Sequence, residues 1–198
     1  MKKLTEYPAI IVDLDGTLYF QRPVRLAMLF DMALHFWQFP DFLIVRKYRK
    51  LYENGCNEAQ RLEQLPEKAV AIVERWMLQR PLKYIAKYQD DRLIDILERT
   101  RQSGTTVIVY SDYPVKDKLS ALAFKPDYAL SADDTGCMKP DARGLCHFLA
   151  SQGINPKECL VIGDREDKDG ILAANMRAES IVLPARKANR RVLYKVME

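Results

Sequence analysis

The sequence predicts an α/β fold in which helices cover both faces of a parallel sheet and one long helical segment is inserted. Five short apolar runs are too brief to be helices, so we interpret each as a buried strand. The runs are Ala9–Val12, Thr106–Tyr110, Tyr128–Leu130, Cys159–Ile162 and Ser180–Leu183. Helical patterns separate the later runs, and this alternation is typical of a parallel sheet.

Two of the intervening helices have clear patterns. Residues 90–104 place four apolar side chains on one face before Gly104, which favours a helix end: Leu93, Ile94, Ile96 and Leu97. Residues 140–153 form the second pattern, with Pro140 suited to a first helical turn and Gly153 as a stop signal. Its inward-facing residues are Leu145, Phe148 and Leu149.

The exception to the alternation lies between the first two strands. Residues 19–83 are predicted to form several helices in succession, which makes them an inserted all-helical cap on a core of residues 1–18 and 84–198. The cap holds 11 Lys and Arg against 7 Asp and Glu, whereas the core holds 20 of each. The net charge of +4 therefore belongs to the cap.

Composition limits the class of protein. A chain of 198 residues with 48% hydrophobic content can form one core plus an insertion. Glu6 and Pro8 interrupt the start of the chain, so we expect no secretory signal. The cysteines form no C-x-x-C pair and have no zinc-ligand spacing, which favours a reduced, cytoplasmic protein: Cys56, Cys137, Cys146 and Cys159.

Residues 26–45, "LAMLFDMALHFWQFPDFLIV", are apolar enough to suggest a membrane span. However, Asp31 in a bilayer would cost about 3 kcal/mol, and each large apolar residue returns only about 0.3 to 0.6 kcal/mol. Pro40 before Asp41 also resembles a helix boundary. We therefore expect two packed helices and no membrane span. Surface association, helped by the basic run "RKYRK" at 46–50, remains an alternative.

The stretch "IIVDLDGTLYF" places two acidic residues directly after the first predicted strand. Asp13 and Asp15 are two residues apart, so an extended backbone directs both carboxylates to the same side. Like charges this close resist joint ionisation. The pair therefore implies a metal ion, a shared proton, or both.

Other polar residues follow the later strands. Ser111 and Asp112 follow the second strand, Asp164 follows the fourth with Asp169 beyond it, and Lys139 precedes a helix. Ligands of open parallel sheets bind beyond the carboxyl ends of the strands, so these side chains should meet Asp13 and Asp15.

This combination resembles the haloacid dehalogenase superfamily of phosphohydrolases, in particular members with a helical cap between the first and second motifs. "DLDGTL" matches the first motif and "GDREDKD" the fourth, with Ser111 and Lys139 in the expected order between them. The resemblance implies a Rossmann-like core of five parallel strands in the order 5-4-1-2-3. It also implies Mg2+ as cofactor and phosphate transfer through an aspartyl-phosphate.

Phosphoryl transfer needs a nucleophile, charge neutralisation and a proton for the leaving oxygen. We assign Asp13 as nucleophile and metal ligand, and Asp15 as general acid and base whose backbone carbonyl also contacts the metal. Asp164 completes the metal ligands, and Asp169 orients it or a metal-bound water. The phosphate-binding residues are Ser111, Asp112 and Lys139.

The leading interpretation is a phosphatase for a small soluble phosphomonoester. A sugar phosphomutase with the same nucleophile and a non-catalytic regulatory protein that uses its basic cap remain alternatives. Asp15 argues against a haloalkanoic acid dehalogenase, and no motif selects a cap lysine for phosphonate cleavage. We expect no nucleic-acid partner, and the sequence does not predict the oligomeric state.

Overall fold

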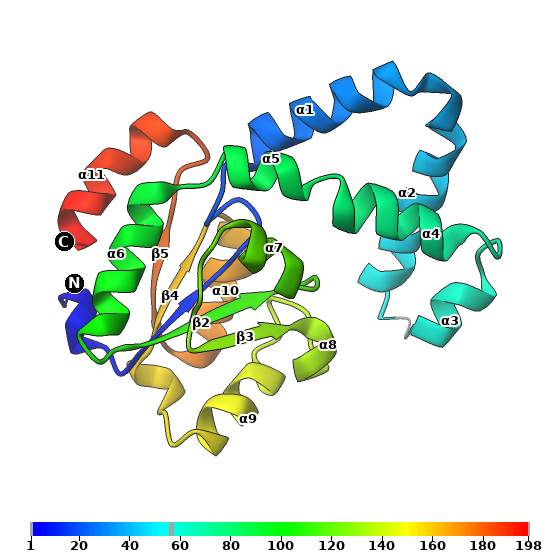
Figure 1. Ribbon diagram of the computed structural model, residues 1–198. Coiled ribbons are helices and arrows are strands. Elements are labelled where there is room, and N and C mark those ends of the chain that lie inside the picture. The colour runs from blue at the N-terminus through cyan, green and yellow to red at the C-terminus, as the bar shows by residue number, and fades with distance from the viewer. Residues whose placement is uncertain (1, 56–57, 198) are drawn as a thin grey trace.

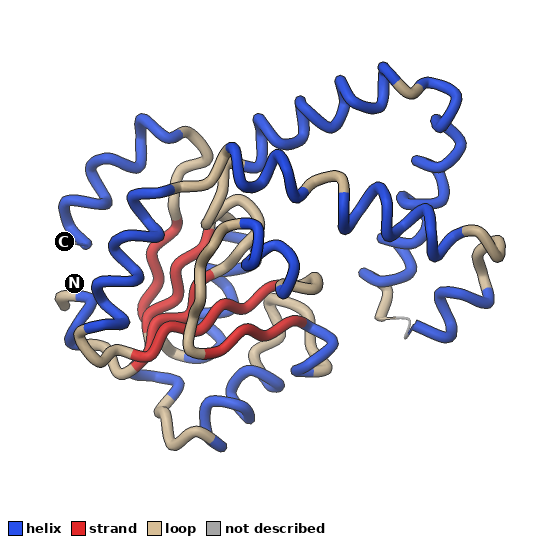
Figure 2. Tube along the Cα trace, viewed as in Figure 1, coloured by secondary structure: helices blue, strands red, loops and turns tan. Residues whose placement is uncertain are grey.

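The computed structural model describes residues 2–55 and 58–197, so Cys56 lies outside the described residues. Its centre is a five-stranded sheet in the order β3-β2-β1-β4-β5, in which all neighbouring strands are parallel (Figures 1 and 2). The strands are β1 (Ala9–Val12), β2 (Thr106–Ser111), β3 (Tyr128–Ser131), β4 (Leu160–Gly163) and β5 (Glu179–Val182). The predicted fold class, strands and strand order are confirmed.

Side chains that alternate along β1 build two separate hydrophobic layers. Ile10 and Val12 pack with Leu93 and Leu97 on one face of the sheet. Ile11 packs on the other face, in a cluster with residues of two further helices. Both faces are therefore covered, which explains why the strands are continuous apolar runs.

Helices of the core flank the sheet (Figure 1). They are α6 (Asp91–Gln102), α7 (Lys116–Ala121), α8 (Ala132–Thr135), α9 (Arg143–Ser151), α10 (Ile171–Met176) and α11 (Lys187–Met197). The core also contains two 3-10 helices, η1 (Leu4–Glu6) and η4 (Pro156–Glu158), and the π-helix η5 (Glu166–Gly170).

The sequence located α6 well but placed the start of α9 too early. Asp90 caps α6 by accepting a hydrogen bond from the Leu93 backbone N–H. The α9 helix begins at Arg143 instead of Pro140, because residues 139 and 140 form a turn and Asp141 accepts from the Arg143 backbone N–H.

The described residues between β1 and α6 form a helical cap. Its elements are α1 (Gln21–Leu34), η2 (Phe36–Gln38), α2 (Phe39–Glu53), α3 (Glu58–Glu63), α4 (Ala69–Val73), η3 (Glu74–Gln79) and α5 (Leu82–Lys87). A small core of its own contains Val45, Ile72 and Trp76. Within the described part of the chain, no helix is long and apolar enough to cross a membrane.

The two chain segments that join the cap to the core lie side by side. Phe20 N–H donates to the Tyr88 carbonyl over 2.9 Å, and Asp90 N–H donates to the Leu18 carbonyl over 2.8 Å. Tyr19 and Gln89 form the bridge between these hydrogen bonds. The boundaries of the cap at residues 19 and 83 stay a prediction. We place the two connections between cap and core in these paired segments.

Candidate active site

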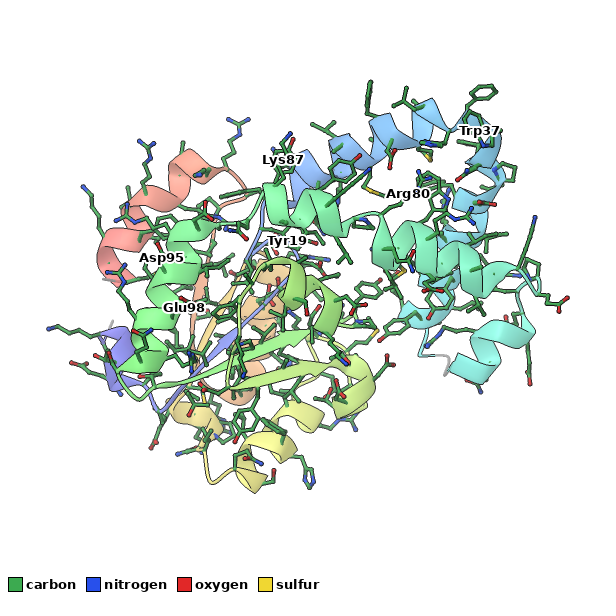
Figure 3. All side chains as sticks on the ribbon, in the orientation of Figure 1. Tyr19, Trp37, Arg80, Lys87, Asp95 and Glu98 are labelled. Atoms are coloured by element: carbon green, nitrogen blue, oxygen red, sulfur yellow. The ribbon has the colours of Figure 1, made fainter. Side chains whose placement is uncertain are left out.

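The polar residues that follow the strands line one cavity of about 700 Å³ between the core and the cap. Asp13, Ser111 and Asp164 stand at the carboxyl ends of β1, β2 and β4. Tyr19 lies at this end of the sheet, below the cap (Figure 3). The sheet therefore brings together side chains that are far apart in the sequence, as expected from its topology.

The cap covers this cavity through contacts with the loop after β2. Tyr113 stacks on Tyr52 of α2 with ring centroids 5.1 Å apart, and its hydroxyl donates to Glu53 Oε1 over 2.8 Å. The Arg49 guanidinium lies 5.4 Å from the centre of the Tyr113 ring. These contacts join the cap to the core at the wall of the cavity, which Arg49, Glu53 and Tyr113 line.

Asp13 is a buried carboxylate with two side-chain partners. It accepts hydrogen bonds from the Lys139 ammonium and, over 3.0 Å, from the Thr17 hydroxyl. Burial raises the pKa of Asp13 to about 7; the negative charge of Asp169 adds to this effect, and the charge of Lys139 opposes it. A second cation beside this carboxylate would favour its ionised, nucleophilic form.

Asp15 is held by groups that the sequence did not identify. Lys118 Nζ of α7 lies 2.6 and 2.7 Å from the two carboxylate oxygens, and the Tyr19 hydroxyl donates to Oδ1. Burial would raise the pKa of Asp15, but the ammonium of Lys118 outweighs it, so the pKa is lowered. Ser111 Oγ also donates to Asp15 Oδ2 over 3.4 Å, so the loop after β1 is in contact with the end of β2.

Lys139 is the central cation of the site. Its side chain is 4% exposed, and its Nζ donates to Asp169 Oδ1 over 2.7 Å as well as to Asp13. Burial opposes the charge, but the two carboxylates outweigh it and raise the pKa of Lys139. The Lys139 backbone N–H donates to Asp112 Oδ1 over 2.7 Å, and Lys168 Nζ lies 3.4 Å from Asp112 Oδ2. The Asp112 carboxylate therefore already has two partners, and its phosphate-binding role stays a prediction.

The acidic residues of the site fit a magnesium ion. Oxygens of Asp13, Asp164 and Asp169 lie within 4.8 Å of one another. Burial raises the pKa of Asp164, and its buried Oδ1 has no hydrogen-bond partner, so this oxygen needs a cation or a proton. Gly16 has a φ of +105°, and a Cβ there would overlap the Asp164 carboxylate. The chain thus requires glycine where the first motif approaches the fourth.

Asp169 has less capacity for a metal than Asp164. Its Oδ1 accepts from Lys139, and its Oδ2 accepts from the Arg165 backbone N–H over 3.2 Å. These contacts agree with an orienting role for Asp169. The assignment of Asp13, Asp15 and Asp164 as metal ligands stays a prediction.

A buried arginine holds the loop that follows β1. Arg190 of α11 is fully buried and donates to the carbonyls of Gly16 and Thr17 as well as to Asp90 Oδ2 over 2.9 Å. The Tyr194 hydroxyl donates to the same Asp90 carboxylate. The sequence analysis missed Arg190, although an arginine on the apolar face of a helix, four residues before Tyr194, is a usable signal.

Comparison with known proteins agrees with this geometry. Residues 7–176 match the family of haloacid dehalogenase-like hydrolases. The chain therefore belongs to this family of hydrolases, as the resemblance of its motifs implied. The comparison with curated proteins gives no match.

Several solved structures share the fold. A putative phosphoglycolate phosphatase from Lactobacillus delbrueckii subsp. bulgaricus is 18% identical, with a TM-score of 0.54 over 97% of this chain and 98% of that chain. CbbY from Rhodobacter sphaeroides, in complex with xylulose 1,5-bisphosphate, is 17% identical, with a TM-score of 0.60 over 92% and 89%. The putative hydrolase YfnB from Bacillus subtilis, bound to magnesium, is 14% identical, with a TM-score of 0.59 over 100% of both chains. At these identities the likeness concerns the fold.

Proposed function

We propose that the protein is a Mg2+-dependent phosphatase that hydrolyses a phosphomonoester through an aspartyl-phosphate. The observation that carries the proposal is the position of Asp13, which lies beside the Lys139 ammonium and within reach of the Asp164 carboxylate in one cavity. The phosphatase and magnesium-bound proteins among the structural neighbours support it.

The first half of the reaction transfers the phosphoryl group to Asp13. Lys139 and the Ser111 hydroxyl bind and orient the phosphate, and the Asp13 carboxylate attacks phosphorus. A bond forms between the carboxylate oxygen and phosphorus while the ester bond to the leaving oxygen breaks. Asp15 supplies the proton that this oxygen needs, and the contact with Lys118 has to loosen before Asp15 takes up a proton.

The second half releases phosphate. Asp15, again ionised, accepts a proton from a water molecule, which attacks the acyl-phosphate. The contacts of Asp15 with Lys118 and Tyr19 favour the ionised carboxylate that this step requires. A phosphomutase would instead return the phosphoryl group to a second substrate.

Asp13, Asp164 and the backbone carbonyl of Asp15 would hold the magnesium ion, and Asp169 would orient them. When bound, the ion supplies positive charge that neutralises the phosphoryl oxygens. We also propose that the protein works in a reducing, cytoplasmic compartment. The cysteines that the structure describes are free thiols, which supports this: Cys137, Cys146 and Cys159.

The test is release of inorganic phosphate by the purified protein from a broad panel of phosphomonoesters. We expect activity with Mg2+, loss of activity in EDTA, and recovery when Mg2+ is added back. Full activity in metal-free buffer would contradict the proposed cofactor. Absence of turnover across the panel would favour a regulatory protein, and transfer of phosphate to a sugar phosphate without a burst of inorganic phosphate would favour a phosphomutase.

A further inference from the structure

The corner of the cap between α1 and α2 exposes an unusual concentration of large apolar side chains. Nine of them lie within residues 26–43. They are Leu26, Leu29, Phe30, Leu34, Phe36, Trp37, Phe39, Phe42 and Leu43. The exposed fractions reach 73% for Phe36 and 62% for Trp37, and Figure 3 shows Trp37 at this corner, far from the sheet. We refer to these nine residues as the apolar corner.

The residues are arranged on helix faces. Leu26, Phe30 and Leu34 follow one another at four-residue intervals, so they share one face of α1. Phe39 and Leu43 share a face of α2 in the same way. Single exposed apolar residues are common on protein surfaces, whereas a contiguous exposed apolar face marks an interaction surface.

Basic residues extend the same two faces away from the corner. Arg22 precedes Leu26 by one turn of α1, and Arg46 and Lys50 continue the face of Phe39 and Leu43 on α2; all three are exposed. Asp31, the acid within α1, is buried and pairs with Arg80 over 3.3 Å. The surface is therefore an apolar tip with basic flanks.

The apolar corner is continuous with the active-site cavity. Leu29 and Phe42 are exposed at the corner and also line the cavity. Further inside, the cavity is lined on the cap side by Met28, Met32 and Val45. A ligand that reaches Asp13 from this side would have apolar contacts along its length.

We propose that the apolar corner docks on the surface of an anionic lipid bilayer, and that the cavity accepts a phosphomonoester with an apolar organic group. Apolar side chains of a surface-bound helix enter the boundary between headgroups and acyl chains, while basic side chains interact with anionic headgroups. The second part of this inference rests on the proposed phosphatase activity, whereas the first part does not.

Charge distinguishes a bilayer from a second copy of the chain as the occupant. A symmetric contact between two apolar corners would bring Arg22, Arg46 and Lys50 of one copy toward the same residues of the other. Such a juxtaposition of like charges is unfavourable. An anionic bilayer complements both the tip and its flanks.

The test measures binding to vesicles by flotation, with phosphatidylcholine alone or with about 30% phosphatidylglycerol. In the corner variant, Leu26, Phe30 and Leu34 are all replaced by Gln, which keeps helix propensity and leaves the cavity lining unchanged. The control variant replaces two equally exposed residues of the core helix α11, Val192→Gln and Val196→Gln. We expect binding of the wild-type protein and the control to the anionic vesicles, and binding at least tenfold weaker for the corner variant. Hydrolysis of p-nitrophenyl phosphate without vesicles should be equal in all three.

A second variant tests the basic flanks, so the proposal does not depend on one set of substitutions. Arg22→Gln, Arg46→Gln and Lys50→Gln together should remove the preference for anionic over zwitterionic vesicles. No binding of the wild-type protein to the anionic vesicles, or binding of the corner variant equal to that of the wild-type protein, would overturn the proposal. So would a wild-type dimer in sedimentation velocity that the corner variant dissociates, because a second copy would then cover the corner.

The substrate part is tested with dodecyl phosphate below its micelle concentration and with ethyl phosphate. We expect a kcat/KM at least tenfold higher for the dodecyl ester, and equal values would overturn this part. Vesicle binding without hydrolysis of any ester would refute the proposed function and leave the docking surface standing. Hydrolysis without vesicle binding would refute the docking surface and leave the proposed function standing.

Discussion

At the carboxyl edge of the sheet, charged side chains are buried among partners, whereas at the corner of the cap, apolar side chains are exposed and the charges lie on the flanks. Lys139 is 4% exposed between two carboxylates, while Phe36 is 73% exposed. The first arrangement fixes the positions of groups that react. The second presents a surface to something outside the chain. We therefore propose that the core carries out the chemistry and that the cap determines which molecules reach it, so substitutions in the two regions should differ accordingly.

The largest effect is expected at the nucleophile. Asp13→Asn is nearly isosteric but removes the negative charge that attacks phosphorus, so turnover should fall by at least about a thousandfold. The melting temperature should change little, because burial already disfavours the charge of Asp13 and Lys139 keeps Asp169 as a partner. Phosphate release and thermal unfolding measure the two effects.

Asp167→Asn is the matched control for this substitution. Asp167 belongs to the same acidic segment as Asp164, but it is exposed and pairs with Arg165 at the surface. Its variant should retain nearly full activity. A wild-type rate in the Asp13 variant would contradict the prediction, because Asp13 would then matter no more for turnover than Asp167.

The second effect concerns the proton. Asp15→Asn should slow hydrolysis of an alkyl phosphate by roughly 10²- to 10⁴-fold, because its leaving oxygen needs a proton. The loss should be smaller for p-nitrophenyl phosphate, whose leaving group needs little protonation. Steady-state rates for the two esters test this. Equal losses would mean that Asp15 only anchors Lys118 and Tyr19.

The third prediction tests whether the buried charges at this edge of the sheet also stabilise the fold. Arg190→Met leaves the buried Asp90 carboxylate without its cation and the Gly16 and Thr17 carbonyls without their donor. Removal of one partner of a buried ion pair costs about 3–5 kcal/mol, so the free energy of unfolding in urea should fall by that order. Arg191→Met, at an exposed neighbouring position, should change it by less than about 0.5 kcal/mol. Equal stability of the two variants would show that the buried network is dispensable.

The sequence predicted the sheet and the strand-end acids because both depend on local patterns. Short apolar runs identified the five strands, and parallel topology places Asp13 and Asp164 at one edge without further information. It did not predict Lys118 or Arg190. Lys118 is 103 residues from Asp15, and Arg190 is 174 residues from Gly16. Long flexible side chains of this kind choose their partners through the tertiary fold, and no spacing in the sequence encodes the choice.

The segment 26–45 shows a different limit. The sequence correctly divided it into two helices, and neither of these described helices is long and apolar enough to cross a membrane. Yet the prediction that these helices pack did not anticipate that most of their large apolar residues would remain exposed. Periodicity identifies an apolar face, but it does not say whether the chain itself covers that face.

The smallest effect is expected from the basic run of the cap. Replacement of Arg46, Lys47, Arg49 and Lys50 with Gln should lower kcat/KM for the best substrate by roughly 2- to 10-fold at low salt. All four side chains are exposed on α2, and Arg49 also lines the cavity. Their positive charges should attract an anionic substrate, so the variant should also respond less to ionic strength. A series of kcat/KM measurements at increasing salt gives both results.

A control with the same change of charge on the surface of the core tests whether the position of the basic residues matters. Four exposed basic residues serve for this: Lys125, Lys157, Arg186 and Arg191. If general attraction by net charge were sufficient, both sets of glutamines would lower kcat/KM equally. We expect the cap set to have the larger effect, because the field of a charge decays within about 10 Å at 0.1 M salt, and of the two sets only the cap set has a member, Arg49, that lines the cavity. The small ester p-nitrophenyl phosphate should respond less than the best substrate, since it needs few contacts with the cap. An identical response of both esters would assign selectivity to the aromatic residues near the cavity instead of to the basic run.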